Sequence, residues 1–265
     1  MSSILRPTPA QRTRRLVVLA AAAFAVITPV VQTLAGFGLS QAEFAAQGDR
    51  TLRVAGYAFS IWGLIYLGIL AYAVRQALPQ TGESRLINRL GWPSAVAFFG
   101  VGFWIVMAAM NLQAASVAVI FASLLALLIP LLLEAATVRG LGRAERDRWL
   151  VVWPLAALAG WLTVAAPLNL ITAATALDRL PQTPSPAAWA ILAIVVIVLA
   201  ALAVTALLRT LAYPLPAAWG LLGAFVAEQP DQPAVAFAAL GGAIALLLGG
   251  VLLTFRLRPG VERAA

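Results

Sequence analysis

Three stretches of the sequence carry aromatic side chains at helical spacing beside polar ones. Phe59, Trp62 and Tyr66 stand at positions i, i+3 and i+7, which form one face of a helix. Spacings of three and four recur in two further sets: Trp104, Met107 and Asn111, and Trp161, Ala165 and Asn169. Aromatic faces can stack on a flat hydrophobic molecule while amides orient its polar edge. These nine residues therefore predict a ligand-binding pocket.

The residues that usually carry catalysis are missing. The chain has no Cys and no His, so it lacks a thiol nucleophile, the commonest general base and the commonest metal ligand. No Asp, Glu or Arg lies near the middle of an apolar run, whereas proton relays and ion-coupled carriers keep such residues in the membrane. We therefore expect no enzyme, no catalytic residue and no metal site.

Composition predicts an integral membrane protein. The chain is 62% hydrophobic and 11% charged, whereas soluble domains are about half apolar and about a quarter charged. The net charge of +8 comes from 18 basic residues, all Arg, which lie in loops between apolar runs. Cytoplasmic loops of membrane proteins are enriched in such residues, so the charge does not indicate a nucleic-acid partner.

The apolar runs predict an all-α fold with eight transmembrane helices. The run from Gly91 to Val138 is over twice the length that crosses a bilayer, so it must turn near Asn111–Ser116. The first run is longer than the apolar core of a cleaved signal, which makes it an uncleaved first helix. The predicted spans are 15–37, 54–76, 92–112, 115–137, 150–176, 187–208, 210–228 and 233–256.

Arginine distribution predicts the orientation of these helices. With both ends in the cytoplasm, fifteen Arg fall in inner segments, and only Arg50, Arg53 and Arg179 fall outside. The span 210–228 is the weakest, with Pro214 and Pro216 near its start, but it must cross for the Arg-rich C-terminus to face inward. We expect a bacterial inner (plasma) membrane protein with both termini cytoplasmic.

A simpler explanation of the aromatic and amide residues competes with the pocket. Trp and Tyr anchor proteins at membrane interfaces, and Asn and Gln join helices by hydrogen bonds. Four Trp lie at span ends and fit this role: Trp92, Trp149, Trp153 and Trp189. Trp62, Trp104 and Trp161 lie deeper, at depths near those of the amides, and anchoring explains them less well.

Two segments resemble a known family. "FSIWGLIY" is similar to the second-helix signature of the tryptophan-rich sensory protein family (TspO/MBR, translocator protein), with Trp62, Gly63 and Tyr66 in register. "WLTVAAPLN" matches the fifth-helix signature through Trp161 and Asn169, and "MN" at 110–111 matches the third-helix motif loosely. The chain departs where the family has a third-helix Trp and a fifth-helix Pro-Tyr, since Ala114 and "AL" at 157–158 stand there.

The resemblance implies a division of the chain and a ligand. Residues 1–177 would form the family's five-helix bundle, and residues 178–265 a three-helix extension that follows a Pro-rich linker. Family members bind porphyrins, and some bind sterols, under the first loop, here 38–53. Porphyrin or haem is thus the implied ligand, with Trp62 and Tyr66 lining the pocket and Asn111 and Asn169 at its polar edge.

Three functions remain open from the sequence. The first is a sensory or regulatory membrane protein that binds a planar hydrophobic ligand. The second is a permease for a small hydrophobic solute, and the third, an enzyme that degrades the ligand, has least support. The expected partners are membrane lipids and a hydrophobic small molecule, without nucleic acid, and a homodimer is one option for assembly.

Overall fold

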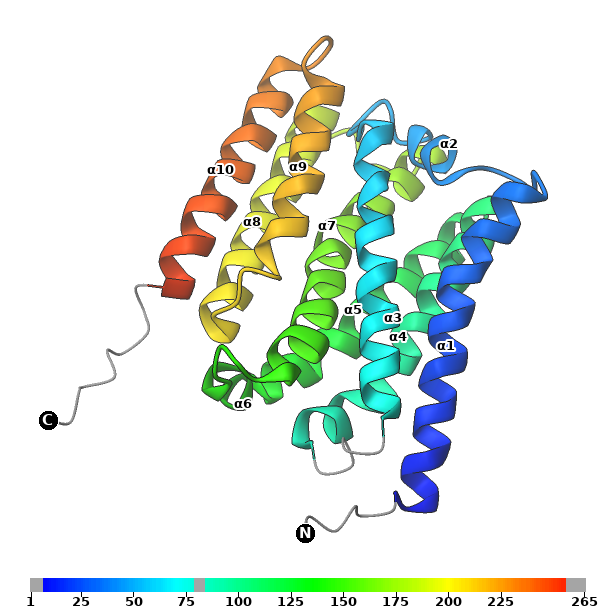
Figure 1. The fold of residues 1–265 in the computed structure, drawn as a ribbon. Coiled ribbons are helices and arrows are strands. Elements are labelled where there is room, and N and C mark those ends of the chain that lie inside the picture. Colours follow the sequence, from blue (N-terminus) through cyan, green and yellow to red (C-terminus); the bar gives the residue numbers. More distant parts are fainter. Residues whose placement is uncertain (1–6, 79–83, 256–265) are drawn as a thin grey trace, which may run out of the picture.

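The computed structural model describes residues 7–78 and 84–255, and every regular element among them is helical. Long helices form the bundle that Figure 1 shows: α1 (Pro9–Leu34), α3 (Ile61–Ala77), α4 (Arg85–Ala109), α5 (Gln113–Leu133), α7 (Trp153–Ala176), α8 (Pro186–Leu208), α9 (Pro214–Glu228) and α10 (Pro233–Phe255). Short helical segments connect them: α2 (Gln41–Ala46), η1 (Gly56–Ser60), α6 (Ala135–Gly140) and η3 (Arg148–Val152).

Seven of the described helices are long and apolar enough to cross a membrane. The predicted all-α membrane fold is confirmed, and the eighth predicted span, 210–228, forms only the 15-residue α9. Such a helix is about 22 Å long, against about 30 Å for the hydrocarbon core. Residues 211–213 form a turn, and the helix starts at Pro214, which suits a first helical position. In Figure 1, α9 runs antiparallel to α8 and α10.

Local sequence sets the ends of several helices. Thr8 caps α1 in a reciprocal arrangement with Gln11, and Ser185 caps α8 just before Pro186. The turn predicted inside the long apolar run is confirmed, because α4 ends at Ala109 and α5 begins at Gln113. Asn111 takes a left-handed backbone conformation there, with φ of 55°, which Asn tolerates better than most residues.

The last three helices pack on one another, and α9 also packs closely on α7. Gly160 of α7 lies directly against the backbone carbonyl of Tyr213, where a Cβ atom would collide with the oxygen. The hydroxyls of Thr163 and Tyr213 are 2.6 Å apart. Buried apolar residues of both parts belong to one core. The division at residues 177 and 178 stays a prediction.

The two ends of the bundle differ in their segments. The beginning of α1, the end of α10 and α6 lie at one end in Figure 1, and α2 lies at the other. We call these the α6 end and the α2 end. The predicted cytoplasmic Arg residues within the described ranges lie at the α6 end, and Arg50, Arg53 and Arg179 lie at the α2 end. Which end faces the cytoplasm stays a prediction.

Candidate functional site

A small cavity of about 60 Å³ lies beneath α2, between α3, α4, α5 and α7. We call it the aromatic cavity. Six predicted site residues line it: Phe59, Trp62, Trp104, Trp161, Ala165 and Asn169. The other lining residues are Phe44, Ala45, Leu52, Val54, Ile120, Leu168 and Thr172. The helical spacings thus bring three faces to one cavity, and their role in binding stays a prediction.

Aromatic rings form one wall of this cavity. Trp161 meets Trp62 edge-on at 6.0 Å between ring centroids, and it meets Phe59 in the same way at 6.5 Å. Tyr66 stacks on Trp62 at 5.3 Å with an interplanar angle of 21°. Tyr66 therefore supports Trp62 from the side and does not itself line the cavity.

Three donors in this wall lack a partner within the described residues. The indole nitrogens of Trp62 and Trp161 and the hydroxyl of Tyr66 are buried and make no hydrogen bond. Buried polar groups are normally paired, so unpaired ones need an explanation. Two of the three belong to residues that line the cavity. A ligand that carries hydrogen-bond acceptors would have donors to meet here.

Asn169 joins three helices at the edge of the cavity. Its Oδ1 accepts a hydrogen bond from Trp104 Nε1 at 3.0 Å, and its Nδ2 donates to Ser116 Oγ at 2.9 Å. The side chain is thereby fixed between α4, α5 and α7. Because an amide can make up to four hydrogen bonds, two remain for a ligand.

Met107 and Asn111 do not line the cavity. Asn111 is exposed, and its Oδ1 accepts hydrogen bonds from Gln47 at 2.9 Å and from Gln113 at 2.8 Å. The helical spacing from Met107 to Asn111 does not set a common face, since α4 has already ended at Ala109. Asn111 instead connects the segment after α2 to the turn between α4 and α5.

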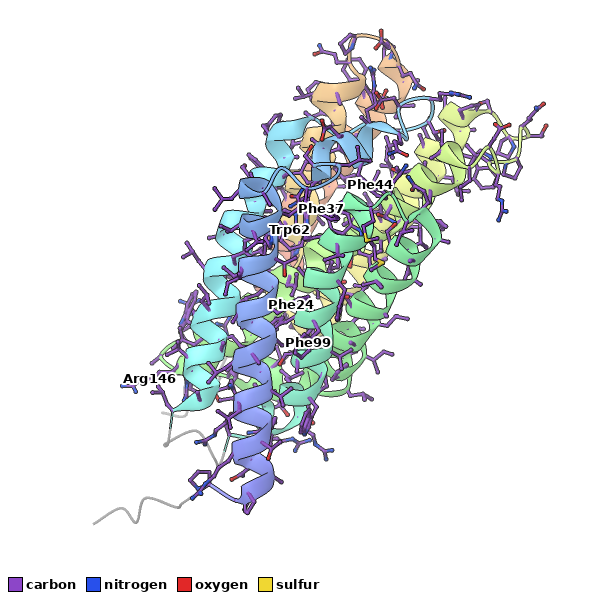
Figure 2. All side chains as sticks on the ribbon, turned by 90° about the vertical axis from the view of Figure 1, so that its right-hand side faces the viewer. Phe24, Phe37, Phe44, Trp62, Phe99 and Arg146 are labelled. Carbon is purple, nitrogen blue, oxygen red and sulfur yellow. The ribbon has the colours of Figure 1, made fainter. Side chains whose placement is uncertain are left out.

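The segment 38–55 covers the cavity and is here called the lid. Phe44 in α2 is only 1% exposed, and its ring meets Trp104 edge-on at 6.1 Å. Figure 2 shows Phe44 and Trp62 together in the half of the bundle nearest the lid. Ser40 caps α2, and its backbone N–H and hydroxyl lower the pKa of Glu43. The lid's lining residues were missed from the sequence, which placed this loop only by resemblance.

The lid also packs on the last turns of α7. Gly48 lies so close to Thr172 that an added Cβ would come within 2.8 Å of the hydroxyl oxygen. The hydroxyls of Thr51 and Thr175 are 2.9 Å apart. These contacts hold the lid down over the cavity, which is why the enclosed space is small.

Helix α9 and the turn after it, which belong to the predicted three-helix extension, hold the end of the lid that leads to α3. The backbone N–H of Arg53 donates to the buried carboxylate of Glu228, and the Arg53 guanidinium lies 2.7 Å from Asp231. The hydrogen bond to Asp231 raises the pKa of Arg53. The N–H of Ala55 donates to Gly223 O at 3.0 Å. The extension is thus part of the structure that closes the aromatic cavity.

Comparison with known proteins identifies one family. A family model described as TSPO-like protein matches residues 14–252, which includes both the first five long helices and most of the extension. No curated protein and no solved structure matched the chain.

Proposed function

The chain belongs to the TSPO-like family, and from this premise we propose that it binds a planar, porphyrin-like ligand in the aromatic cavity, with a sensory or regulatory role. The family suggests a membrane protein that binds a ligand or senses one, and it is generally non-enzymatic. The observation that carries the proposal is the aromatic wall, in which the indole N–H groups of Trp62 and Trp161 are buried and have no partner among the described residues.

The wall matches such a ligand in two ways. Indole and phenyl faces stack on flat conjugated rings and contribute about 0.5–1.5 kcal/mol per aromatic pair beyond burial. The unpaired N–H donors would meet acceptor atoms at the rim of the ligand, such as carboxylates. Asn169, which is fixed by Trp104 and Ser116, adds a rigid polar group beside them.

The size of the cavity requires the lid to move. A cavity of about 60 Å³ is far below the roughly 300–1,000 Å³ of small-molecule sites. Phe44 of the lid fills the space beneath α2, and the side-chain contacts of Gln47, Thr51 and Arg53 follow α2 in the chain. We infer that the ligand enters as α2 lifts and Phe44 withdraws.

The test is a titration of protoporphyrin IX into the purified full chain, followed by quenching of Trp fluorescence. Trp62→Ala removes a stacking face and buried apolar area, so it should weaken binding by about 2–3 kcal/mol, or about 30- to 150-fold. Trp189→Ala is the matched control, because the Trp189 indole does not line the cavity and its N–H donates to Pro181 O at 3.0 Å. It should change affinity less than about threefold.

The outcomes separate the candidate functions. If a folded Trp62→Ala protein bound the porphyrin as tightly as wild type, Trp62 would contribute only to packing, and the proposal would be contradicted. Flux of the same porphyrin into sealed vesicles would favour a permease, which the contact between the extension and the lid makes worth testing. Chemical change of the bound porphyrin would indicate an enzyme.

We further propose that the α6 end faces the cytoplasm of a bacterial inner membrane. The support is the bias of Arg toward that end. A reporter fused after Ala265 should be active only in the cytoplasm, and activity on the outer side would contradict this orientation.

A further inference from the structure

A second, larger cavity lies at the α6 end of the bundle. Its volume is about 410 Å³, within the range of about 300–1,000 Å³ typical of small-molecule sites. The segment 138–143 forms one side, and the end of α8 with Arg209 and Thr210 forms another. Four arginines line it: Arg139, Arg143, Arg148 and Arg209. We call this cavity the arginine pocket.

The carboxylates at this end pair mostly with other arginines. Glu134 lies 2.9 Å from Arg85 and 3.7 Å from Arg89, and Asp147 lies 2.7 Å from Arg75. Hydrogen bonds from Thr137 and Arg85 lower the pKa of Glu134, which keeps it charged in this pairing.

The arginine pocket itself keeps an excess of positive charge. The Oε1 atom of Glu145, which does not line the pocket, accepts the backbone N–H of the lining residue Gly142 at 2.6 Å. Among the described residues, none of the ion pairs involves Arg139, Arg143 or Arg209. Carbonyl groups at the pocket take some of the donors, since Arg139 donates to Leu207 O at 2.6 Å and Arg148 to Leu141 O at 3.0 Å. Three lining arginines, Arg139, Arg143 and Arg209, thus have no carboxylate partner among the described residues, which gives the pocket a positive potential suited to an anion.

Arg209 has an unusual backbone for its residue type. Its φ and ψ are 52° and 49°, the left-handed region, at the position where α8 ends. Gly or Asn normally occupies such a position, because other residues lose about 1–2 kcal/mol there. Its Nε is buried without a hydrogen-bond partner in the described structure. A residue that lines the pocket thus combines a left-handed backbone with a buried donor that no described residue accepts.

An exposed tryptophan beside the arginine pocket suggests that the pocket lies near the lipid headgroups. Trp149 follows Arg148 directly, is 48% exposed, and donates its indole N–H to Arg143 O at 2.8 Å. Exposed Trp residues of membrane proteins concentrate where the hydrocarbon meets the headgroups. The pocket also has apolar lining, including Val138, Val152 and Leu208. A lipid could thus reach it with its headgroup while its chains stay in the bilayer.

We propose that the arginine pocket binds the phosphate group of an anionic membrane phospholipid. Arg and phosphate form short, charge-assisted and often bidentate hydrogen bonds. Basic pockets between helices at a membrane surface are suited to anionic headgroups. Binding would pair the guanidinium groups of the pocket and hold the end of α8 against the loop between α6 and α7.

The test measures retention of phosphatidylglycerol by the purified full chain in detergent, by native mass spectrometry over a lipid titration. Arg209→Asn removes the charge and places a residue that tolerates the left-handed backbone, so the fold should be kept or stabilised. Arg143→Gln removes a charge from an exposed loop. Each should weaken retention about fivefold or more, and the double variant about 25-fold.

Arg146→Gln is the matched control. Arg146 belongs to the same loop, does not line the arginine pocket, and points away from the bundle in Figure 2. It should change retention less than twofold, a small surface effect. Equal losses of lipid retention for Arg146→Gln and Arg209→Asn would show that anionic lipid is attracted by the general positive charge of this end. The arginine pocket would then not be a specific site.

Two further arms identify the ligand. Phosphatidylcholine carries no net charge and should be retained at least about tenfold less well than phosphatidylglycerol. Equal retention of the two lipids would contradict the proposal. Inorganic phosphate is the second probe. If it bound the arginine pocket as tightly as phosphatidylglycerol does, the ligand would be a free anion, and the proposal of a membrane phospholipid would be wrong.

Discussion

The aromatic cavity and the arginine pocket lie at opposite ends of the bundle, and α7 or the segment leading into it contributes to both. The first is about 60 Å³ in volume, and aromatic rings form one wall of it. The second is about 410 Å³ and is lined by four arginines. Each nevertheless contains buried donors that no described residue accepts, the indole N–H groups in one and Arg209 Nε in the other.

The chemistry of the two ends suits them to different ligands. A neutral indole N–H beside stacked rings suits a flat molecule with acceptors at its rim. A guanidinium in a pocket of net positive charge suits a phosphate. The three-helix extension contributes to both ends, through Glu228 at the lid and through Arg209 at the arginine pocket.

The largest expected effect comes from loosening the extension, which should disturb both ends together. In Gly160→Ala the new Cβ collides with the carbonyl oxygen of Tyr213, and a backbone atom cannot move aside easily. We expect a loss of about 2–3 kcal/mol in the free energy of unfolding, near the upper range for overpacking, measured by thermal denaturation in detergent.

Gly241→Ala in α10 is the control for helix propensity, because a Cβ there meets no atom within 4 Å. It should be neutral or slightly stabilising. If the Gly160→Ala protein matched wild type in stability and in both ligands, docking of α9 on α7 would not support the two sites.

Glu228→Gln should affect the aromatic cavity alone. The buried Glu228 carboxylate accepts the backbone N–H of Arg53, and a charge-assisted hydrogen bond of this kind is worth about 1.5–3 kcal/mol. We expect hydrogen exchange of the amides at 51–55 to accelerate by about tenfold or more. Asp231→Asn should have a much smaller effect, since Asp231 is exposed. Weaker retention of phosphatidylglycerol in Glu228→Gln would show that the two ends are coupled.

Asn169→Ala should have a moderate effect at the aromatic cavity. It removes the acceptor for Trp104 Nε1 and the donor to Ser116 Oγ, and hydrogen bonds between membrane helices are worth about 0.6–1.7 kcal/mol. A double-mutant cycle with Trp104→Phe should show coupling of this size in unfolding measurements. Strictly additive losses would mean that the bond to Trp104 contributes nothing.

Asn111→Gly should have the smallest effect on ligand affinity. Gly keeps the left-handed backbone while it removes the bonds from Gln47 and Gln113. Because Asn111 lies outside the aromatic cavity, porphyrin affinity should change less than about threefold. A loss of porphyrin affinity above tenfold would indicate that Asn111 contacts the polar edge of the ligand, as the sequence predicted.

Helical periodicity explains how much of the aromatic cavity was predictable. Within α3 and α7 the spacing of Trp62, Trp161 and Asn169 holds because both helices continue through them, so these residues reach one cavity. Periodicity fails for Asn111, since α4 ends two residues earlier. It also cannot show that Tyr66 would stack on Trp62 and thereby stand behind the wall.

The arginine pocket could not be predicted from the sequence. The positive-inside pattern accounts for every Arg at the α6 end equally well, whether it is paired or not. Which arginines remain unpaired depends on contacts between distant segments, such as Glu134 with Arg85. The left-handed backbone of Arg209 also follows from tertiary packing, because no Gly or Asn marks the end of α8.

The most direct test of two separate sites is the porphyrin affinity of Trp62→Ala and of Arg209→Asn, measured side by side on folded full-length protein. We expect Trp62→Ala to lose about 30- to 150-fold in affinity and Arg209→Asn to lose less than about threefold. Equal porphyrin affinities for Trp62→Ala and wild type, or equal losses of affinity in the two variants, would contradict the assignment of the porphyrin-like ligand to the aromatic cavity.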